Sequence, residues 1–264
     1  MKRMLVLVLL TLNVFTLFSQ KALLCRAWLG NELEYIRIDT AEVFWEMPGY
    51  SPEQKKYLLI KDTLRLYDRY TTSRDNFSKR HITNYDFLIC GLSDTAMVLR
   101  PINSPALKLT GNRNYIAYKE RHLVKKALSG FEWIKFQSTT CRGDCPAQLL
   151  EITLDRKLKF IGGPHAFKKG GFYTAIIPDS LFLQLYEKLS LANLEKIKRW
   201  DQFVSDAPEY TIEVKYNNKT WHIDGFLLPT SMHELIDYLL KIASQVQLFE
   251  SKEPFIISLG KAEE

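Results

Sequence analysis

Short segments in which apolar and polar residues alternate recur along most of this chain, and this pattern constrains its fold more than any other feature. A period of two is typical of a strand with one buried face, because successive side chains point to opposite sides. Within 34–119, turn residues separate such segments, and turns at 61–62 and 91–94 predict two hairpins. We therefore expect an antiparallel β meander, and closure into a small barrel or half-barrel would remove its exposed edges.

The pattern changes after about residue 130, where strand-like segments are mixed with helix-like ones. Alternation predicts strands on both sides of TTCRGDCP and of GGPHAFKKGG, and a hairpin within YTIEVKYNNKTWHIDG. The spacing of apolar residues predicts helices over 181–189, over 191–200 and from Ser231 onward. With a further edge strand at 255–259, this order is typical of an α+β domain, an antiparallel sheet with two or three helices packed on it.

The first 20 residues have the three parts of a secretory signal peptide. Lys2 and Arg3 precede an apolar run over 4–18, and the small or polar residues Ser19 and Gln20 follow it. This run is shorter than the roughly 20 residues that a membrane-spanning helix needs. We therefore expect cleavage after Ser19 or Gln20, and export to the periplasm, the cell envelope or the outside of the cell.

These patterns together predict four parts of the chain. They are a signal peptide at 1–20, a β-rich domain at 21–130, an α+β domain at 131–250 and a tail at 251–264. A lipid anchor on Cys25 is an alternative to simple cleavage. A lipoprotein signal has a small residue directly before its cysteine, however, and Leu24 stands at that position.

The charge of the chain is uneven along its length. Residues 21–130 carry 18 Lys plus Arg against 12 Asp plus Glu, whereas 131–264 carry 16 against 18. A basic domain attracts anionic partners, and for an exported protein we expect an anionic envelope glycan or lipid, or another envelope protein, rather than nucleic acid. The segment RDNFSKRH, with Arg65, Arg69 and Tyr70 nearby, mixes basic and aromatic residues that can bind a phosphate or a sugar. An exposed hairpin face is the simpler interpretation.

Four cysteines, Cys25, Cys90, Cys141 and Cys145, lie beyond the expected cleavage point. All four are candidates for disulfide bonds in an oxidising compartment, and they allow three pairings. The local pair of Cys141 and Cys145 is favoured, with Gly143 supplying the freedom that lets the loop fold back. Closing so small a loop would stabilise the fold by about 2 kcal/mol.

Thiol redox or copper chemistry is the alternative for the same two cysteines. Thiolates bind Cu(I), and Cys141 and Cys145 with His165 or His222 would make a ligand set similar to that of thioredoxin-like copper-delivery proteins. In those proteins a helix follows the motif, and its N-terminus lowers the cysteine pKa. Alternation after Pro146 predicts a strand instead, which favours a structural disulfide.

Sequence motifs for other chemistry are missing from the chain. It contains no His-Glu-x-x-His, no Gly-x-Ser-x-Gly and no phosphate-binding glycine loop. The tripeptide Arg142-Gly143-Asp144 could act in adhesion, but a tripeptide of such common residues also arises by chance. We expect no cofactor, and a binding or interaction role rather than an enzymatic one.

The Cys-x-Gly-x-Cys-Pro motif and the segments after it resemble a known family. The matching features are TTCRGDCPAQLLEITLDRKLKFIGG, the Asp-x-Pro that precedes the hairpin in SDAPEYTIEVKYNNKTWHIDG, and a closing helix, together within 133–249. This stretch resembles the bacterial domain-of-unknown-function family 6438, which is found in exported envelope proteins. The resemblance implies an exported α+β domain, and it assigns no catalytic residues because the family has no established activity.

Overall fold

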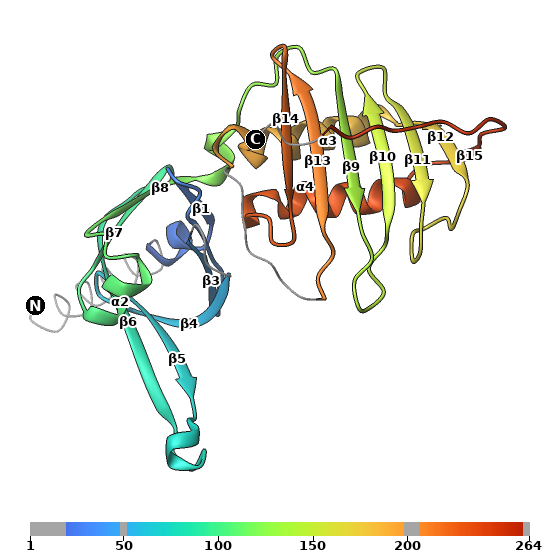
Figure 1. The fold of residues 1–264 in the computed structure, drawn as a ribbon. Coiled ribbons are helices and arrows are strands. Elements are labelled where there is room, and N and C mark those ends of the chain that lie inside the picture. Colours follow the sequence, from blue (N-terminus) through green and yellow to red (C-terminus); the bar gives the residue numbers. More distant parts are fainter. Residues whose placement is uncertain (1–19, 48–51, 198–205, 261–264) are drawn as a thin grey trace, which may run out of the picture. The chain divides into compact units, whose positions relative to one another are not determined.

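The computed structural model describes residues 20–47, 52–197 and 206–260 (Figure 1). It divides into two compact units, Met1–Val124 and Lys125–Glu264, each with its own hydrophobic core. The predicted signal peptide lies outside the described residues, apart from Gln20. Within these ranges, no helix is long and apolar enough to cross a membrane.

The first unit is a closed antiparallel barrel of eight strands, which confirms the predicted meander and its closure. Each strand pairs with the next one along the chain, and β1 pairs with β8 to complete the ring. A closed ring leaves no exposed sheet edge. The strands are β1 (Ala27–Gly30), β2 (Tyr35–Ile38), β3 (Glu42–Glu46), β4 (Glu53–Ile60), β5 (Thr63–Tyr70), β6 (His81–Leu92), β7 (Ala96–Pro101) and β8 (Ile116–Glu120).

Large side chains from the inward faces of these strands fill the barrel. Trp28, Trp45, Phe87 and Tyr118 are all buried. The Trp45 ring stacks on Phe87 with centroids 5.1 Å apart, and it meets Tyr118 edge-on at 6.3 Å. Aromatic side chains remove a large apolar area from water when buried, so this cluster is a main source of the unit's stability.

A short helix, α2 (Ser104–Leu109), packs on the barrel core through Ala106. Asn103 caps it, because its side-chain oxygen accepts a hydrogen bond of 3.0 Å from the Ala106 N–H. The same side chain accepts from the backbone N–H of Asp86 at 3.2 Å and donates to the carbonyl of Asn84 at 3.1 Å. These bonds hold the start of α2 against β6. Two short 3-10 helices, η1 (Ser73–Asp75) and η2 (Arg121–Val124), complete this unit.

The second unit is an antiparallel sheet of seven strands with α-helices on one face, which confirms the predicted α+β architecture (Figure 1). The strand order is β14-β13-β9-β10-β11-β12-β15. The strands are β9 (Trp133–Ser138), β10 (Gln148–Thr153), β11 (Lys157–Gly162), β12 (Phe172–Ile176), β13 (Tyr210–Tyr216), β14 (Lys219–Gly225) and β15 (Phe249–Glu250). The helices are α3 (Asp179–Ala192), α4 (Thr230–Lys241) and the 3-10 turns η3 (Leu194–Lys196) and η4 (Ile242–Ser244).

The core of the second unit lies between the sheet and its helices. Phe136, Leu150 and Phe160 come from the sheet, Leu185 comes from α3 and Leu239 comes from α4, and all five are fully buried. Their alternation within the strands and their helical spacing within α3 and α4 explain why the sequence predicts both layers correctly.

One prediction about the helices needs correction. The helix predicted over 191–200 does not form as a separate element, because α3 runs to Ala192 and only Leu194–Lys196 follow as a 3-10 turn. Asn193, which adopts a left-handed conformation with φ 53°, ends α3. The rest of that prediction, from residue 198, lies outside the described residues. The last helix begins at Thr230, directly after Pro229, which confirms the start predicted near Ser231.

The predicted edge strand at 255–259 is also wrong. Those residues form no strand, and the tail instead crosses the sheet on the face opposite the helices (Figure 1). The Phe255 ring packs edge-on against Phe172 at 5.3 Å, and Lys135 donates to the carbonyl of Ser258 at 2.7 Å. In a segment that crosses the strands, backbone groups form hydrogen bonds with side chains of the sheet rather than with the backbone of a neighbouring strand. An alternating sequence in such a segment therefore does not indicate an edge strand.

Candidate functional site

Two strands of the barrel continue beyond their outer neighbours and form a projecting arm (Figure 1). The pairing of β4 with β5 ends at Lys56 and Tyr67, whereas β5 and β6 stay paired as far as Tyr70 and His81. The pairing of β6 with β7 begins only at Phe87. Within residues 68–84, here called the arm, β5 and β6 therefore pair with each other and with no other strand.

Contacts between side chains give the tip of the arm a defined structure. The Tyr70 ring stacks on His81 with centroids 5.4 Å apart. The His81 ring Nε2 lies 2.6 Å from Asp75, and this hydrogen bond lowers the pKa of the Asp75 carboxyl, with burial opposing it. The tip also contains η1 and the left-handed residues Asn76 and Phe77, with φ of 53° and 58°.

Phe77 is unusual both in its backbone conformation and in its exposure. A left-handed conformation is unfavourable for a bulky side chain by roughly 1–2 kcal/mol. The residue is 65% exposed, so its side chain packs little against the rest of the chain, although its N–H donates to the carbonyl of Thr72 at 2.9 Å. Strained residues of this kind cluster at functional sites. Tyr70 and Ile82 add further exposed apolar surface to the arm.

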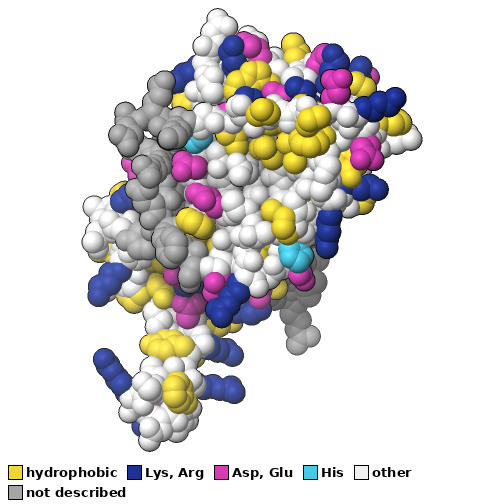
Figure 2. All heavy atoms as spheres, turned by 45° about the vertical axis from the view of Figure 1, so that its right-hand side comes forward, with side chains coloured by type: hydrophobic (Ala, Val, Ile, Leu, Met, Phe, Trp, Pro, Cys, Tyr) yellow, Lys and Arg dark blue, Asp and Glu magenta, His cyan; other side chains and the backbone are white. Residues whose placement is uncertain are grey.

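Four basic side chains surround this apolar surface. Arg69, Arg74, Lys79 and Arg80 are all exposed, and none of them makes an ion pair within the described parts of the chain. The lower end of Figure 2 shows Lys and Arg side chains projecting from the sides of the arm, with hydrophobic side chains between them. The acidic residue at the tip, Asp75, contacts His81 rather than one of these four basic side chains. The tip is therefore strongly basic.

Sequence reasoning found the basic and aromatic composition of this segment but assigned it to an ordinary exposed hairpin face. It missed the length of the arm and the conformation of Phe77. The sequence does contain one signal for the turn at the tip, an Asn-Phe pair with basic residues on both sides, because asparagine is common in left-handed turns. Nothing in the local pattern shows that the phenylalanine adopts the same conformation.

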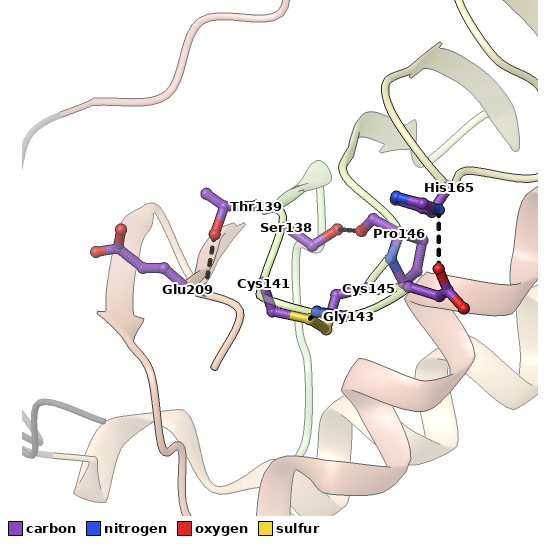
Figure 3. The surroundings of a disulfide bond; sticks show 9 residues. Ser138, Thr139, Cys141, Gly143, Cys145, Pro146, His165 and Glu209 are labelled. Carbon is purple, nitrogen blue, oxygen red and sulfur yellow. Dashed lines mark hydrogen bonds and ion pairs between the residues drawn. A yellow bond between two sulfur atoms is a disulfide. The ribbon is translucent and has the colours of Figure 1, made fainter. Parts of the chain in front are cut away.

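The cysteine motif forms a small closed loop between β9 and β10 (Figure 3). Cys141 and Cys145 are joined by a disulfide with their Cα atoms 5.5 Å apart. At the two ends of the loop, Ser138 donates to the carbonyl of Pro146 at 2.6 Å, and the Thr139 hydroxyl accepts from the Glu209 N–H at 2.9 Å. The first bond joins the two ends of the loop in addition to the disulfide, and the second ties its N-terminal end to the backbone before β13.

The adhesion tripeptide lies within this loop and is exposed, but both of its charged side chains have partners. Asp144 lies 3.4 Å from His165 (Figure 3), and Arg142 lies 3.4 Å from Asp206. Gly143 is not in a left-handed conformation, and an added Cβ would meet only the Cys141 sulfur, at 3.8 Å. The prediction that this turn needs a glycine is therefore wrong.

The proposed copper ligands are not brought together. Strand β10 follows Pro146 within two residues, so no helix N-terminus faces the cysteines. His165 contacts Asp144, whereas His222 lies on β14, 3.0 Å from the buried Glu213. Among the residues that the structure describes, no cluster of three or more His, Cys, Asp or Glu side chains is arranged to hold a metal ion.

The other two cysteine candidates do not form a disulfide. Cys25 and Cys90 are both free, so of the four candidates only Cys141 and Cys145 are joined. Cys25 is half-buried, and its sulfur lies 4.0 Å from the Tyr57 hydroxyl. Burial and the neighbouring Cys25 raise the pKa of Tyr57 to about 12. Cys90 is exposed beside an irregularity in the pairing of β6 with β7.

Comparison with known proteins gives a match only within the second unit. No curated protein and no solved structure matches the chain. A family model, Domain of unknown function (DUF6438), matches residues 132–243, which include the cysteine motif, the central strands and both helices of the sheet unit. The C-terminal half of the chain is therefore similar to this family of unknown function, as its Cys-x-Gly-x-Cys-Pro motif predicts.

Proposed function

We propose that this protein is an exported, non-enzymatic binding module of the bacterial envelope, and that it attaches to an anionic lipid surface through the arm. The predicted signal peptide and a disulfide, which is typical of oxidising compartments, support export. The observation that carries the binding role is the arm itself, where a strained and exposed Phe77 stands among basic side chains without ion-pair partners in the described structure.

The composition of the arm fits the surface of an anionic bilayer. Each Lys or Arg near such a surface contributes about 1 kcal/mol. Burying one phenylalanine side chain in an apolar environment contributes roughly 1.5–3 kcal/mol. Neither contribution alone holds a protein firmly, but four basic residues together with Phe77 give a binding free energy of several kcal/mol.

An anionic lipid suits the arm better than the other expected partners. A glycan offers charge and hydroxyl groups, but it has no apolar layer that could take up Phe77, Tyr70 and Ile82. Aromatic side chains are common where a protein meets the boundary between water and hydrocarbon, because they combine an apolar body with tolerance of a polar setting. The mixture of exposed apolar and basic side chains at a projecting tip therefore favours lipid.

Co-sedimentation with lipid vesicles tests this proposal. We expect the mature protein to bind vesicles of 30% phosphatidylglycerol in phosphatidylcholine, and to bind pure phosphatidylcholine far more weakly. Arg74→Ser, Lys79→Ser and Arg80→Ser together should reduce the affinity roughly 100-fold, the equivalent of about 3 kcal/mol. A matched control, Lys61→Asn with Arg100→Ser and Lys119→Ser, removes three exposed basic residues of the same barrel outside the arm and should have little effect.

Two results would overturn the proposal. One is equal binding to vesicles with and without phosphatidylglycerol. The other is an equal loss of affinity in the arm variant and the control variant, since net charge rather than the arm would then explain binding. Binding to a soluble anionic polysaccharide such as polygalacturonate without binding to vesicles would assign the arm to a glycan partner.

A further inference from the structure

The sheet unit contains a pocket that the proposed lipid attachment does not use. It has a volume of about 320 Å³ and lies where the start of β13, the connection from β14 to α4, and α4 itself meet. Small-molecule sites commonly have volumes of roughly 300–1,000 Å³ and combine an apolar lining with a few polar groups. The lining of this pocket is mostly apolar and includes Phe226, Leu227, Ile236, Tyr210, His233 and Asp237.

The Tyr210 hydroxyl is a polar group of this pocket that has no partner in the described chain. The ring is held in place by stacking on Phe136, with centroids 6.0 Å apart. The residue is half-buried, but its hydroxyl is accessible to solvent and makes no hydrogen bond within the described residues. Two other tyrosines of the same unit, Tyr186 and Tyr238, donate to backbone carbonyls at 3.0 and 2.7 Å. The Tyr210 hydroxyl is therefore open to a ligand in the pocket.

Asp237 places a negative charge near this hydroxyl. Its carboxylate is exposed on α4 and makes no ion pair with any residue that the structure describes. Burial raises the pKa of Tyr210, and the charge of Asp237 raises it further, so the two groups interact electrostatically. A titratable group that is shifted both by burial and by a specific charged neighbour within a pocket is typical of functional sites.

The remaining polar side chain of the lining is fixed by the protein. His233 lies one turn before Asp237 on α4, and its ring Nε2 donates to the carbonyl of Leu228 at 3.1 Å, because a carbonyl oxygen can only accept. No Lys or Arg side chain lines the pocket in the described structure. The pocket therefore combines an apolar surface with one carboxylate and one phenol, and it has no basic group of its own.

A cation with an apolar body fits these groups better than a metal ion or an anion. Among the described residues, no cluster of His, Cys, Asp or Glu side chains is arranged to hold a metal. An anion would be repelled by Asp237. An ammonium group, in contrast, can donate one hydrogen bond to the Asp237 carboxylate and another to the Tyr210 hydroxyl oxygen.

We propose that this pocket binds a small primary amine with an apolar body, whose ammonium group is held by Asp237 and Tyr210. The apolar body of the amine packs against Phe226 and Ile236. All lining residues lie within 132–243, the stretch that matches the family of unknown function, and none belongs to the arm. Amine binding and vesicle binding can therefore succeed or fail independently.

The probe for this proposal is 2-phenylethylamine, which carries an ammonium group at pH 7. Ligand-observed NMR titration of the full mature protein without vesicles should show one binding site per chain. The amine should bind about tenfold more tightly than 2-phenylethanol, which has the same apolar body without the charge. The anionic analogue 3-phenylpropionate should not bind. These comparisons use the unchanged protein, so they remain decisive even if a variant folds poorly.

Substitutions locate the site on the chain. Asp237→Asn should lower the affinity for the amine about tenfold and leave that for 2-phenylethanol unchanged. Tyr210→Phe keeps the stacked ring but removes the hydroxyl, and it should lower the affinity about threefold. The matched control is Glu234→Gln, which removes an exposed carboxylate of the same helix outside the pocket and should have no effect.

Three results would overturn the proposal. The amine could fail to bind, or it could bind no more tightly than 2-phenylethanol. The third is an equal loss of affinity in Asp237→Asn and Glu234→Gln, since the overall charge of the helix rather than the pocket would then explain binding.

Discussion

The tip of the arm in the barrel unit and the disulfide loop in the sheet unit are both exposed turns between paired strands, but their charged side chains behave differently. In the disulfide loop, Arg142 and Asp144 each have a partner on a neighbouring loop. In the arm, Arg74, Lys79 and Arg80 have no ion-pair partner in the described structure. Exposed ion pairs contribute little to stability, so this difference concerns the local balance of charge: the loop has acidic and basic side chains together, whereas basic side chains predominate in the arm.

The two turns also differ in backbone conformation. A covalent bond closes the disulfide loop, and Gly143 is in an ordinary conformation there. The arm instead holds Phe77 in a left-handed conformation with its ring exposed. The first turn is built to hold two central strands together, and the second keeps an aromatic side chain available at an energetic cost. This contrast supports the proposal that the barrel unit carries the binding function and that the cysteine motif has a structural role.

Of the single substitutions that compare the arm with the disulfide loop, replacing Phe77 should have the largest effect on vesicle affinity. Phe77→Asn keeps the left-handed conformation, which asparagine tolerates, but removes the apolar ring. Affinity for vesicles with 30% phosphatidylglycerol should fall roughly 30-fold, the equivalent of about 2 kcal/mol, while the free energy of unfolding should stay the same or rise. Co-sedimentation and urea unfolding measure the two quantities.

A matched control for this substitution is Leu58→Asn, which removes an exposed apolar side chain from the barrel wall outside the arm. It should leave vesicle affinity unchanged. If both variants lose affinity alike, general surface hydrophobicity rather than the arm drives binding.

Removing the disulfide should lower the stability of the fold without changing vesicle affinity, the opposite of what Phe77→Asn should do. Cys141→Ser with Cys145→Ser should lower the free energy of unfolding by about 2 kcal/mol, because the closed loop no longer restricts the unfolded chain. Vesicle affinity should not change. A lower midpoint in urea unfolding, with co-sedimentation unaffected, is the expected result. An unchanged midpoint would contradict a structural role for this bond.

Thiol counting separates the structural role from the thiol-redox or copper alternative. A thiol-reactive dye should find two free thiols per chain in the denatured, unreduced protein, those of Cys25 and Cys90, and all four cysteines after reduction. Four reactive thiols before reduction, together with one Cu(I) bound per chain and lost in Cys145→Ser, would support the alternative instead.

Acid should loosen the arm before it affects the covalently closed loop. The hydrogen bond from His81 holds the pKa of Asp75 below its ordinary value of 3.8. A carboxyl whose pKa is lower in the folded than in the unfolded state stabilises the fold above about pH 4, and this contribution is lost as pH falls through the lowered value. Hydrogen exchange of 68–84 should therefore increase relative to 139–146 on acidification. Asp75→Asn should already show faster exchange at pH 7.

The smallest expected effect concerns Gly143. Because its backbone is in an ordinary conformation and a Cβ has room, Gly143→Ala should change the free energy of unfolding by less than about 0.5 kcal/mol. A loss above about 1 kcal/mol, measured by urea unfolding, would show that the loop needs a glycine after all.

Much of the fold follows from local sequence pattern. Alternation predicts the barrel strands and the strands β9 to β14, because one face of each is buried in a core. The same reasoning places strand β10 after Pro146, which is the observation that separates this motif from a redox helix. It fails for 255–259, since an alternating segment can lie across a sheet as readily as along its edge.

The candidate sites could be predicted only in part. Basic and aromatic residues in RDNFSKRH are visible in the sequence, but the length of the arm depends on where β4 and β7 stop pairing.

Hydrogen exchange measured with and without vesicles tests the central claim most directly, because it locates the contact on the chain. Vesicles with 30% phosphatidylglycerol should protect the backbone amides of 68–84, and vesicles of phosphatidylcholine alone should not. The disulfide loop at 139–146 should exchange at the same rate in both. Protection of the disulfide loop or of the sheet unit, with the arm unchanged, would contradict the account.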